Sequence, residues 1–379
     1  LHWPRVGASD YLVPQWPVVS TPADRLVHKG DGMTVGLIGT GRMAAQRFKY
    51  VNELADHDIR WVCSRDSGRA RAFLADHGAG KPGAGGPGAP AQKPEIEVVA
   101  SPAEGIERLP VDAIIDTSPN ALHRRNAQRA FDAGCHLFVE YPHACTVEDG
   151  RWMIDAAERA GVSLHVGLTH RFGAGHERLA RIFGGDATGA IGVDLGAVRS
   201  YSEVICSGNP ISRWFDDDSL SGGMFVASMY HFIDQACSYF GDPTSLRASY
   251  GASRDEAGLI HRDSGHAILG FAEGRTIVNI AYSRGFEKPG LGSRTLVVFD
   301  HGYLERSGGE TIVRTPDGER TIDIPDDDAM RADTRRFFEC VSGSGGADRN
   351  QSPEWAQTSL QVACSLQEDA GLTAGRKLQ

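Results

Sequence analysis

The segment TVGLIGTGRMA, residues 34–44, decides the fold. Its apolar start predicts a short buried strand, and the helix-forming stretch Ala44–Leu54 follows the glycines. Glycine at positions 39 and 41 allows a tight turn and a close approach of the backbone to a ligand. A diphosphate can then bind at the positive N-terminus of the helix, although an ordinary glycine turn is the alternative. The residues expected to bind it are Gly39, Thr40, Gly41, Arg42, Met43 and Ala44.

Strand-like and helix-like segments keep alternating as far as residue 168. This alternation predicts an α/β Rossmann domain, a doubly wound parallel sheet with right-handed crossovers. Functional residues of such a domain lie at the carboxyl ends of the strands. The later short apolar runs are Ile59–Cys63, Glu97–Ala100, Ala113–Asp116, His136–Glu140 and Ser163–Leu168.

After Thr169 the pattern changes to longer strand-like runs. One helix, Met224–Phe240, interrupts them, and two helical stretches around Asp327–Ser342 and Glu354–Ala370 close the chain. The pattern predicts an α+β domain with a large, mostly antiparallel sheet. The strand-like runs are Gly196–Val204, Leu246–Gly251, His266–Phe271, Thr276–Ser283, Arg294–Asp300, Gly302–Arg306 and Glu310–Thr315.

A chain of 379 residues fits two domains, since single cores stop growing at roughly 250–300 residues. We expect a Rossmann domain at 33–168 and a substrate domain at 169–379. Residues 1–32 contain four prolines without a helical or strand period, which predicts an extended or disordered lead. Residues 78–94 are rich in Gly, Ala and Pro and are expected to form a surface insertion.

The composition excludes several classes of function. With 39 Lys and Arg against 49 Asp and Glu, the net charge is −10, and no basic stripe points to nucleic acid or an anionic membrane. No window approaches the roughly 18 uncharged apolar residues of a membrane helix, and the start does not resemble a signal peptide, so a cytoplasmic location is expected. The seven cysteines show no metal-ligand spacing, and their odd count argues against a disulfide framework.

The pair Ser64-Arg65 ends the second strand, where an acidic residue usually binds the ribose hydroxyls of NAD. A carboxylate would repel a 2′-phosphate, whereas Arg65 can pair with it and Ser64 can donate a hydrogen bond. This favours NADP(H), with NAD(H) as the second option. The alternative is a solvated surface arginine that Asp66 neutralises.

Two later strand ends carry the segments Asp116-Thr117-Ser118-Pro119-Asn120, followed by His123, and Glu140-Tyr141-Pro142. With the GxGxxA turn, these segments resemble the Gfo/Idh/MocA family of oxidoreductases, which show a TPN…H segment and an EKP segment in this order. The resemblance continues toward the C-terminus through Gly189-x-Ile191-Gly192, Trp214, Gly222-Gly223 and the His231…Asp234 pair.

This resemblance implies a Rossmann domain, an α+β domain whose open sheet commonly mediates oligomers, and oxidation or reduction of sugars, cyclitols and related small molecules. It therefore implies a homo-oligomer, a dimer or tetramer, built through the C-terminal sheet. It also implies that Glu140 and Tyr141 approach the nicotinamide. The other residues that it places at the cofactor, beyond the glycine turn, are Ser64, Arg65, Thr117, Ser118, Pro119, Asn120 and His123.

The chain departs from the family pattern at two positions. Tyr141 stands where the family usually has the Lys of EKP, and Ala227 stands where it usually has an Asp four residues before His231. A neutral phenol suits proton donation better than abstraction, which favours the reductive direction with Tyr141 as donor. The Glu-Tyr-Pro segment is similar to that of biliverdin reductases of the same superfamily. A packing role for Tyr141 in a protein without turnover is the alternative.

The second domain supplies the remaining candidates. We expect His231 in the substrate pocket, with Asp234 one turn later holding its ring in one tautomer; a helix histidine with a structural role is the alternative. Arg171, Trp214 and Asp234 are expected to contact substrate, although Arg171 could equally be structural. The run Asp216-Asp217-Asp218 is expected to be a solvated turn, so no metal site is predicted.

The sequence therefore predicts an NADP(H)-dependent oxidoreductase in which hydride passes between nicotinamide and a small carbonyl, imine or polyol. Tyr141 is the expected proton donor, and His231 orients the substrate or relays the proton. Two other functions stay open. One is a non-redox glycoside-cleaving or lyase enzyme with tightly bound NAD, and the other is a cofactor-binding or regulatory protein without catalysis.

Overall fold

The computed structural model describes residues 32–54, 57–78, 95–208, 213–286, 292–344 and 352–372. The expected N-terminal lead lies outside the described residues except for position 32, and the expected insertion lies outside them except for Gly78. The division of the chain between residues 168 and 169 stays a prediction.

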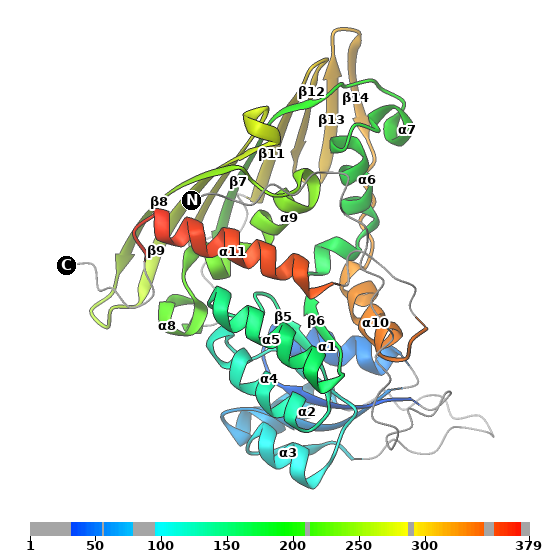
Figure 1. The fold of residues 1–379 in the computed structure, drawn as a ribbon, viewed down its shortest axis with the longest axis vertical. Coiled ribbons are helices and arrows are strands. Elements are labelled where there is room, and N and C mark those ends of the chain that lie inside the picture. The colour runs from blue at the N-terminus through cyan, green and yellow to red at the C-terminus, as the bar shows by residue number, and fades with distance from the viewer. Residues whose placement is uncertain are drawn as a thin grey trace.

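The N-terminal half forms a six-stranded sheet in the order β3-β2-β1-β4-β5-β6, and every neighbouring pair is parallel (Figure 1). This order is that of a Rossmann sheet, so the predicted doubly wound architecture is confirmed. The carboxyl ends of β1, β4, β5 and β6 therefore meet at one edge. The strands are β1 (Thr34–Ile38), β2 (Asp58–Cys63), β3 (Glu97–Val99), β4 (Ala113–Asp116), β5 (His136–Glu140) and β6 (Leu164–Gly167).

Helices cover both faces of this sheet, as parallel strands require. On one face, Leu37 and Ile115 pack in a core that includes Phe48 of α1 and Phe73 of α2. On the other face, α3, α4 and α5 take part in a second core that continues into the C-terminal half of the chain. The helices are α1 (Arg42–Glu53), α2 (Ser67–His77), α3 (Pro102–Arg108), α4 (His123–Asp132) and α5 (Val147–Ala160).

The C-terminal half forms an eight-stranded sheet in the order β14-β13-β12-β11-β7-β10-β9-β8. Its pairs are antiparallel except β7 with β10, so the predicted mostly antiparallel sheet is confirmed. The strands are β7 (Val198–Gly208), β8 (Ser245–Arg254), β9 (Ile260–Phe271), β10 (Thr276–Phe286), β11 (Gly292–Phe299), β12 (Tyr303–Ser307), β13 (Glu310–Thr315) and β14 (Gly318–Ile322), the last not predicted.

One predicted helix is wrong in detail. The stretch expected as a single helix, Met224–Phe240, is a π-helical turn at Met224–Ser228 followed by α9 (Tyr230–Phe240). The Met229 amide donates to the Met224 carbonyl, five residues back, while the Phe225 amide donates to the Gln367 side chain at 3.2 Å. The spacing of apolar residues along the segment cannot predict this hydrogen bond, because Gln367 lies far along the chain.

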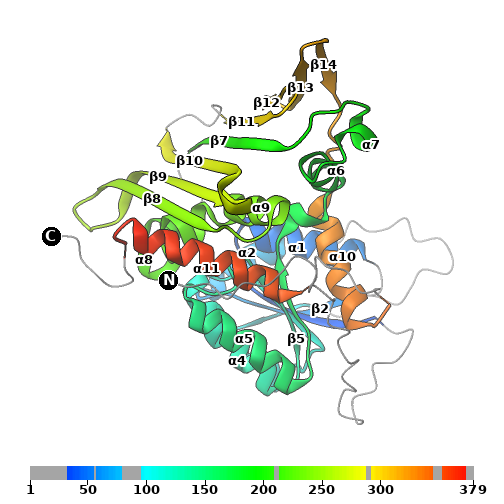
Figure 2. The same ribbon diagram turned by 45° about the horizontal axis from the view of Figure 1, so that its top comes forward.

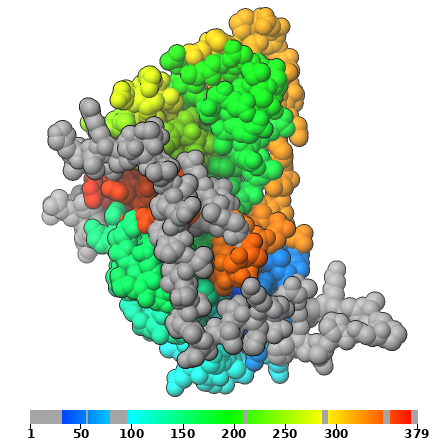
Figure 3. All heavy atoms as spheres, turned by 45° about the vertical axis from the view of Figure 1, so that its right-hand side comes forward, coloured from blue at the N-terminus to red at the C-terminus, as the bar shows by residue number. Residues whose placement is uncertain are grey.

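Two C-terminal helices, α10 (Ala329–Val341) and α11 (Pro353–Asp369), return to the parallel sheet. Phe337 and Phe338 of α10 belong to the same core as Phe138 of β5. Figures 1 and 2 show α11 between the two sheets, and Figure 3 shows α10 beside the N-terminal part of the chain. Within the described ranges, no helix is long and apolar enough to cross a membrane.

Candidate active site

The glycine-rich turn has the geometry of a diphosphate cradle. Gly39 has φ +110°, and a Cβ atom there would lie 2.2 Å from Thr117 Oγ1, so a side chain is excluded. A Cβ at Gly41 would point into open space. Because no side chain caps α1, the first amides of the helix face outward without a partner from a cap. The turn therefore fits an anionic group at the positive end of α1.

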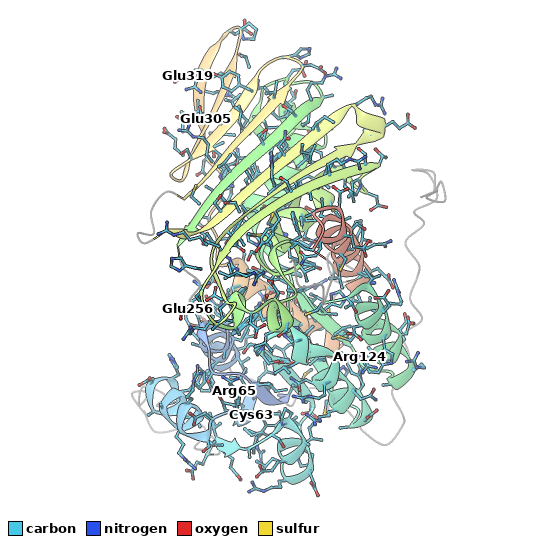
Figure 4. All side chains as sticks on the ribbon, turned by 90° about the vertical axis from the view of Figure 1, so that its left-hand side faces the viewer. Cys63, Arg65, Arg124, Glu256, Glu305 and Glu319 are labelled. Carbon is cyan, nitrogen blue, oxygen red and sulfur yellow. The ribbon has the colours of Figure 1, made fainter. Side chains whose placement is uncertain are left out.

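The end of β2 presents the predicted ribose-side residues. Thr40 Oγ1 and Ser64 Oγ lie 3.2 Å apart, which places Ser64 beside the glycine turn. Arg65 is exposed, in the parallel-sheet part of the molecule (Figure 4), and has no ion-pair partner among the described residues. Asp66 forms no ion pair with Arg65 in the described part of the chain; its carboxylate caps α2 by accepting from the Gly68 amide at 2.8 Å.

Side chains of the segment after β4 form hydrogen bonds with other parts of the protein. Asn120 was expected to line the cofactor, but its amide donates to the Ser221 carbonyl at 2.7 Å. His123 is fully buried, with Nε2 2.8 Å from the Ser118 carbonyl and Nδ1 3.0 Å from the Pro142 carbonyl. These two side chains shape the loop and connect it to the segment after β5, and contact of the His123 ring with the cofactor stays a prediction.

Tyr141 follows β5 directly and lies beside aromatic rings. Its ring stacks on Tyr230 at 5.8 Å and 15°, and lies 5.8 Å from the His231 ring. Burial, with the Glu140 carboxylate and the Tyr282 phenol, raises the pKa of Tyr141 far above its ordinary value. The phenol is therefore neutral, and no described residue forms a hydrogen bond with its hydroxyl.

Glu140, expected to approach the nicotinamide, instead directs its carboxylate to Arg47 of α1. Arg47 Nε donates to Glu140 Oε1 at 2.7 Å, and Arg47 Nη2 donates to Asp333 Oδ2 of α10, also at 2.7 Å. Arg47 is fully buried. Asp333 Oδ1 also lies 2.7 Å from Nε2 of His165, which is buried. One guanidinium thus serves two buried carboxylates at the carboxyl edge of the sheet.

The pKa values of the two carboxyls diverge. Burial raises the pKa of Glu140 in spite of the opposing charge of Arg47. For Asp333, burial acts in the same direction, but Arg47 and His165 outweigh it and lower the pKa. Asp333 is therefore the carboxylate that stays ionised, and Glu140 is the carboxyl that accepts a proton more readily.

His231 lies near Tyr141, but Asp234 does not orient its ring. Burial and the neighbouring His170 lower the pKa of His231 to about 3, so the imidazole is neutral. No described residue forms a hydrogen bond with its ring nitrogens. Ala227, in the π-helical turn, is buried and offers no carboxylate.

Arg171 and Asp234 were expected to contact substrate; the structure pairs these two buried side chains with each other, and their contact with substrate stays a prediction. Arg171 Nε and Nη2 donate to the two oxygens of Asp234 at 2.7 and 2.8 Å. Asp234 also binds Nε2 of His170 at 2.8 Å and accepts from Ser359 of α11 at 2.6 Å. Against the effect of burial, Arg171 and His170 hold the pKa of Asp234 well below its usual range. The cluster is a buried structural ion pair.

Trp214 lies in a short helical turn, stacks on Phe215 at 4.0 Å, and has no ring contact with Tyr141 or His231 among the described residues. The three following aspartates have separate roles. Asp217 caps α8 (Asp218–Ser221), Asp218 pairs with Arg254 at 2.6 Å, and Asp216 lies 3.7 Å from Arg284. The part of the chain that the structure describes holds no cluster of metal ligands.

The buried charged residues at this edge that sequence reasoning missed are Arg47 and Asp333. A signal for Arg47 exists in the helical period: it shares the buried face of α1 with Ala44, Phe48 and Val51. Asp333 likewise shares the buried face of α10 with Phe337. A charged residue on an apolar face implies a buried partner, but periodicity cannot name it.

Comparison with known proteins agrees with this geometry. Residues 33–168 match the sequence model described as an oxidoreductase family with an NAD-binding Rossmann fold, and residues 193–305 match the C-terminal domain of the same family. The chain belongs to the Gfo/Idh/MocA family of NAD(P)-dependent oxidoreductases.

Curated relatives of this Gfo/Idh/MocA protein are distant. It is 25% identical over 256 residues to a scyllo-inositol 2-dehydrogenase (NADP(+)) of Bacillus subtilis, which covers 68% of each chain. It is 32% identical over 136 residues to a glycosyl hydrolase family 109 protein of Shewanella amazonensis, covering 35% of this chain and 28% of that protein.

Among solved structures, the crystal structure of Synechocystis biliverdin reductase with biliverdin and NADP+ superposes with a TM-score of 0.75. The sequence identity is 19%, and the match covers 89% of this chain and 99% of that one. At this identity the likeness concerns the fold alone.

Proposed function

We propose that this protein is an NADP(H)-dependent reductase in which Tyr141 donates the proton. When bound, the nicotinamide supplies hydride to the carbon of a carbonyl or imine, and the Tyr141 phenol gives its proton to the oxygen or nitrogen. Solvent then reprotonates the tyrosinate. His231 orients the substrate next to the phenol.

The observation that carries this proposal is that the Tyr141 phenol is protonated, the form that can donate a proton, and that its ring lies 5.8 Å from the ring of His231. Burial raises the pKa of Tyr141 and lowers that of His231 to about 3, so neither starts as a charged group at neutral pH. An oxidation would need a base that takes the proton of the substrate hydroxyl. In this chain Tyr141 replaces the lysine of the family pattern, and Ala227 replaces the aspartate. Reduction suits these residues better.

The proposed substrate is a small carbonyl, imine or polyol. Its support is the name of the inositol dehydrogenase relative. The test is a panel of aldehydes, ketones, imines and polyols, followed at the nicotinamide absorbance band with NADPH or NADP+. Oxidation of NADPH by a carbonyl or imine is the expected result. Turnover only with polyols and NADP+ would contradict the reductive direction.

The preference for NADP(H) is supported by Arg65, which is exposed beside Ser64 with no described ion-pair partner. Replacing Arg65 by Ser should weaken NADPH binding by about 10–100-fold, since a charge-assisted hydrogen bond to the 2′-phosphate is lost. NADH binding should change little. Arg71→Ser, on the exposed side of α2, is the matched control. Equal losses for both cofactors would contradict the assignment of Arg65.

A second candidate function is supported by the match to the glycosyl hydrolase family 109 protein. That function would be non-redox cleavage of a glycoside with tightly bound NAD. Release of sugar without net change in nicotinamide absorbance would support it. Cofactor binding without turnover of either kind would support a regulatory protein.

A homo-oligomer formed through the eight-stranded sheet is also proposed. Several large apolar side chains on this sheet are exposed in the single chain, which is typical of a surface that another subunit covers. Sedimentation of the purified chain should give a dimer or tetramer, and a monomer would contradict the assignment. The exposed apolar residues are Val204, Ile268, Leu296, Val298 and Tyr303.

A cytoplasmic location stays a prediction that the seven free cysteines favour.

A further inference from the structure

Tyr141 is fixed through both of its chain neighbours. The Glu140 carboxylate before it is bound by Arg47, and the Pro142 carbonyl after it lies 3.0 Å from Nδ1 of His123. Glu140 is the last residue of β5, and Tyr141 follows it directly, so the anchor on Glu140 holds the backbone immediately before the phenol. Fixing the backbone on both sides fixes the direction in which the Tyr141 ring leaves the strand end.

Arg47 itself is fully buried and held by several hydrogen bonds. Besides Glu140, its guanidinium donates to Thr334 Oγ1 at 2.8 Å and to the Met330 carbonyl at 3.2 Å, both in α10. Nη2 donates to Asp333 at 2.7 Å and to Thr169 Oγ1 at 3.2 Å. The planar fork of arginine satisfies these partners at once, which the single ammonium of lysine cannot do.

We propose that Arg47 is a positioning residue for Tyr141, and that Asp333 holds Arg47 in place. A helix far along the chain, α10, then determines where the proton donor points. The path runs through three buried side chains: Asp333, Arg47 and Glu140. The catalytic part of this inference rests on the proposed function, in which Tyr141 gives the proton.

The first test is a double-mutant cycle between Arg47→Lys and Tyr141→Phe. In the wild-type background, Arg47→Lys should lower kcat by about 10–100-fold, as expected for a misdirected reacting group, with little change in KM. In the Tyr141→Phe background, the same substitution should change the residual rate by no more than about twofold. Additive losses would overturn the proposal, because they show that Arg47 acts independently of Tyr141.

Further variants separate positioning from folding. If Arg47→Lys does not fold, Asp333→Asn takes its place as the test. This variant should lower kcat in the same way, but by a smaller factor. Glu140→Gln, which keeps an acceptor for Arg47, should retain more activity than Glu140→Ala. Arg331→Gln is the matched control, since Arg331 lies 3.6 Å from Glu53 and joins the same two helices at the surface. An equal kcat loss in the control would overturn the proposal.

A second readout needs no turnover. With 3-fluorotyrosine incorporated at position 141, the ¹⁹F resonance of the cofactor-free protein should shift or broaden in Arg47→Lys and Asp333→Asn, but not in Arg331→Gln. An unchanged resonance in the first two variants would overturn the positioning role. Full turnover in Tyr141→Phe would instead remove the proposed function, and the ¹⁹F result would still decide the positioning role.

Discussion

Two buried arginine clusters anchor the proposed site, and they differ in charge balance. Among the described residues, Arg171 pairs with the carboxylate of Asp234, which lies one helical turn after His231. Arg47 serves two carboxylates, Glu140 and Asp333, and Glu140 immediately precedes Tyr141. Each cluster also ties a C-terminal helix to the edge of the parallel sheet, α11 through Ser359 and α10 through Asp333.

The difference shows what each cluster can do. In the balanced cluster, Asp234 receives four hydrogen bonds and its pKa is held low, so it stays an anion and fixes the structure. In the cluster with excess negative charge, burial raises the pKa of Glu140. A carboxyl that can take up a proton thus lies next to the proposed proton donor, and the positive charge of Arg47 opposes that uptake.

The largest expected effect is on stability. Arg171→Met and Arg47→Met should each lower the free energy of unfolding by about 3–5 kcal/mol at pH 7, since removing one partner leaves a buried charge uncompensated. Arg47→Met should be the more damaging because it leaves two carboxylates. Urea unfolding followed by circular dichroism measures both.

The control for these variants is Arg331→Gln, at an ion pair whose two side chains are 52% and 39% exposed. It should cost less than about 1 kcal/mol. If Arg47→Met costs no more than this control, the Arg47 cluster is not an essential link between α1 and α10.

The next effect distinguishes the clusters by pH. Because the folded-state pKa of Asp234 is lowered, its stabilisation is complete above the unfolded value of about 3.9 and is lost as the pH falls. The penalty of Asp234→Asn should therefore shrink in acid. The pKa of Glu140 is raised, so its ionised form opposes folding, and the penalty of Glu140→Gln should shrink as the pH rises above about 4.3.

The measurement is the unfolding free energy of the wild type and of both variants from pH 3 to pH 8. The stability penalty of each variant, plotted against pH, gives one slope for each cluster. Slopes of opposite sign are expected. Slopes of the same sign would show that the two clusters do not differ in the way that the geometry indicates.

A smaller effect concerns His231. Glutamine at this position should lower kcat/KM by about 3–10-fold, the loss of one substrate hydrogen bond. With a pKa of about 3, His231 does not titrate near neutrality, so the pH profile should keep its shape between pH 5 and pH 9. The contrary result is an inflection near pH 6.5 in the wild type that disappears in His231→Gln.

Local patterns predicted the fold and the strand-end segments. The glycine turn, the alternation up to residue 168 and the change to longer strands all depend on periods that a single sequence shows. The same patterns placed Tyr141 directly after β5 and Ser64 beside the glycine turn, as the structure has them.

The partners of charged side chains could not be predicted in this way. Arg171 and Asp234 are 63 positions apart, and Arg47 and Asp333 are 286 positions apart, so only tertiary packing brings them together. Sequence reasoning assigned Arg171 and Asp234 to the substrate because buried ion pairs and binding residues use the same side chains. The π-helical turn at Met224–Ser228 was missed for a similar reason, since Gln367 lies far along the chain.

The central claim is that Tyr141 gives a proton to a substrate reduced by the bound nicotinamide. Tyr141→Phe removes one oxygen and tests it most directly, by NADPH binding and single-turnover oxidation of NADPH measured on the same preparation. The account predicts unchanged binding and a turnover lower by about 10²–10⁴-fold. Unchanged binding with unchanged turnover would contradict it.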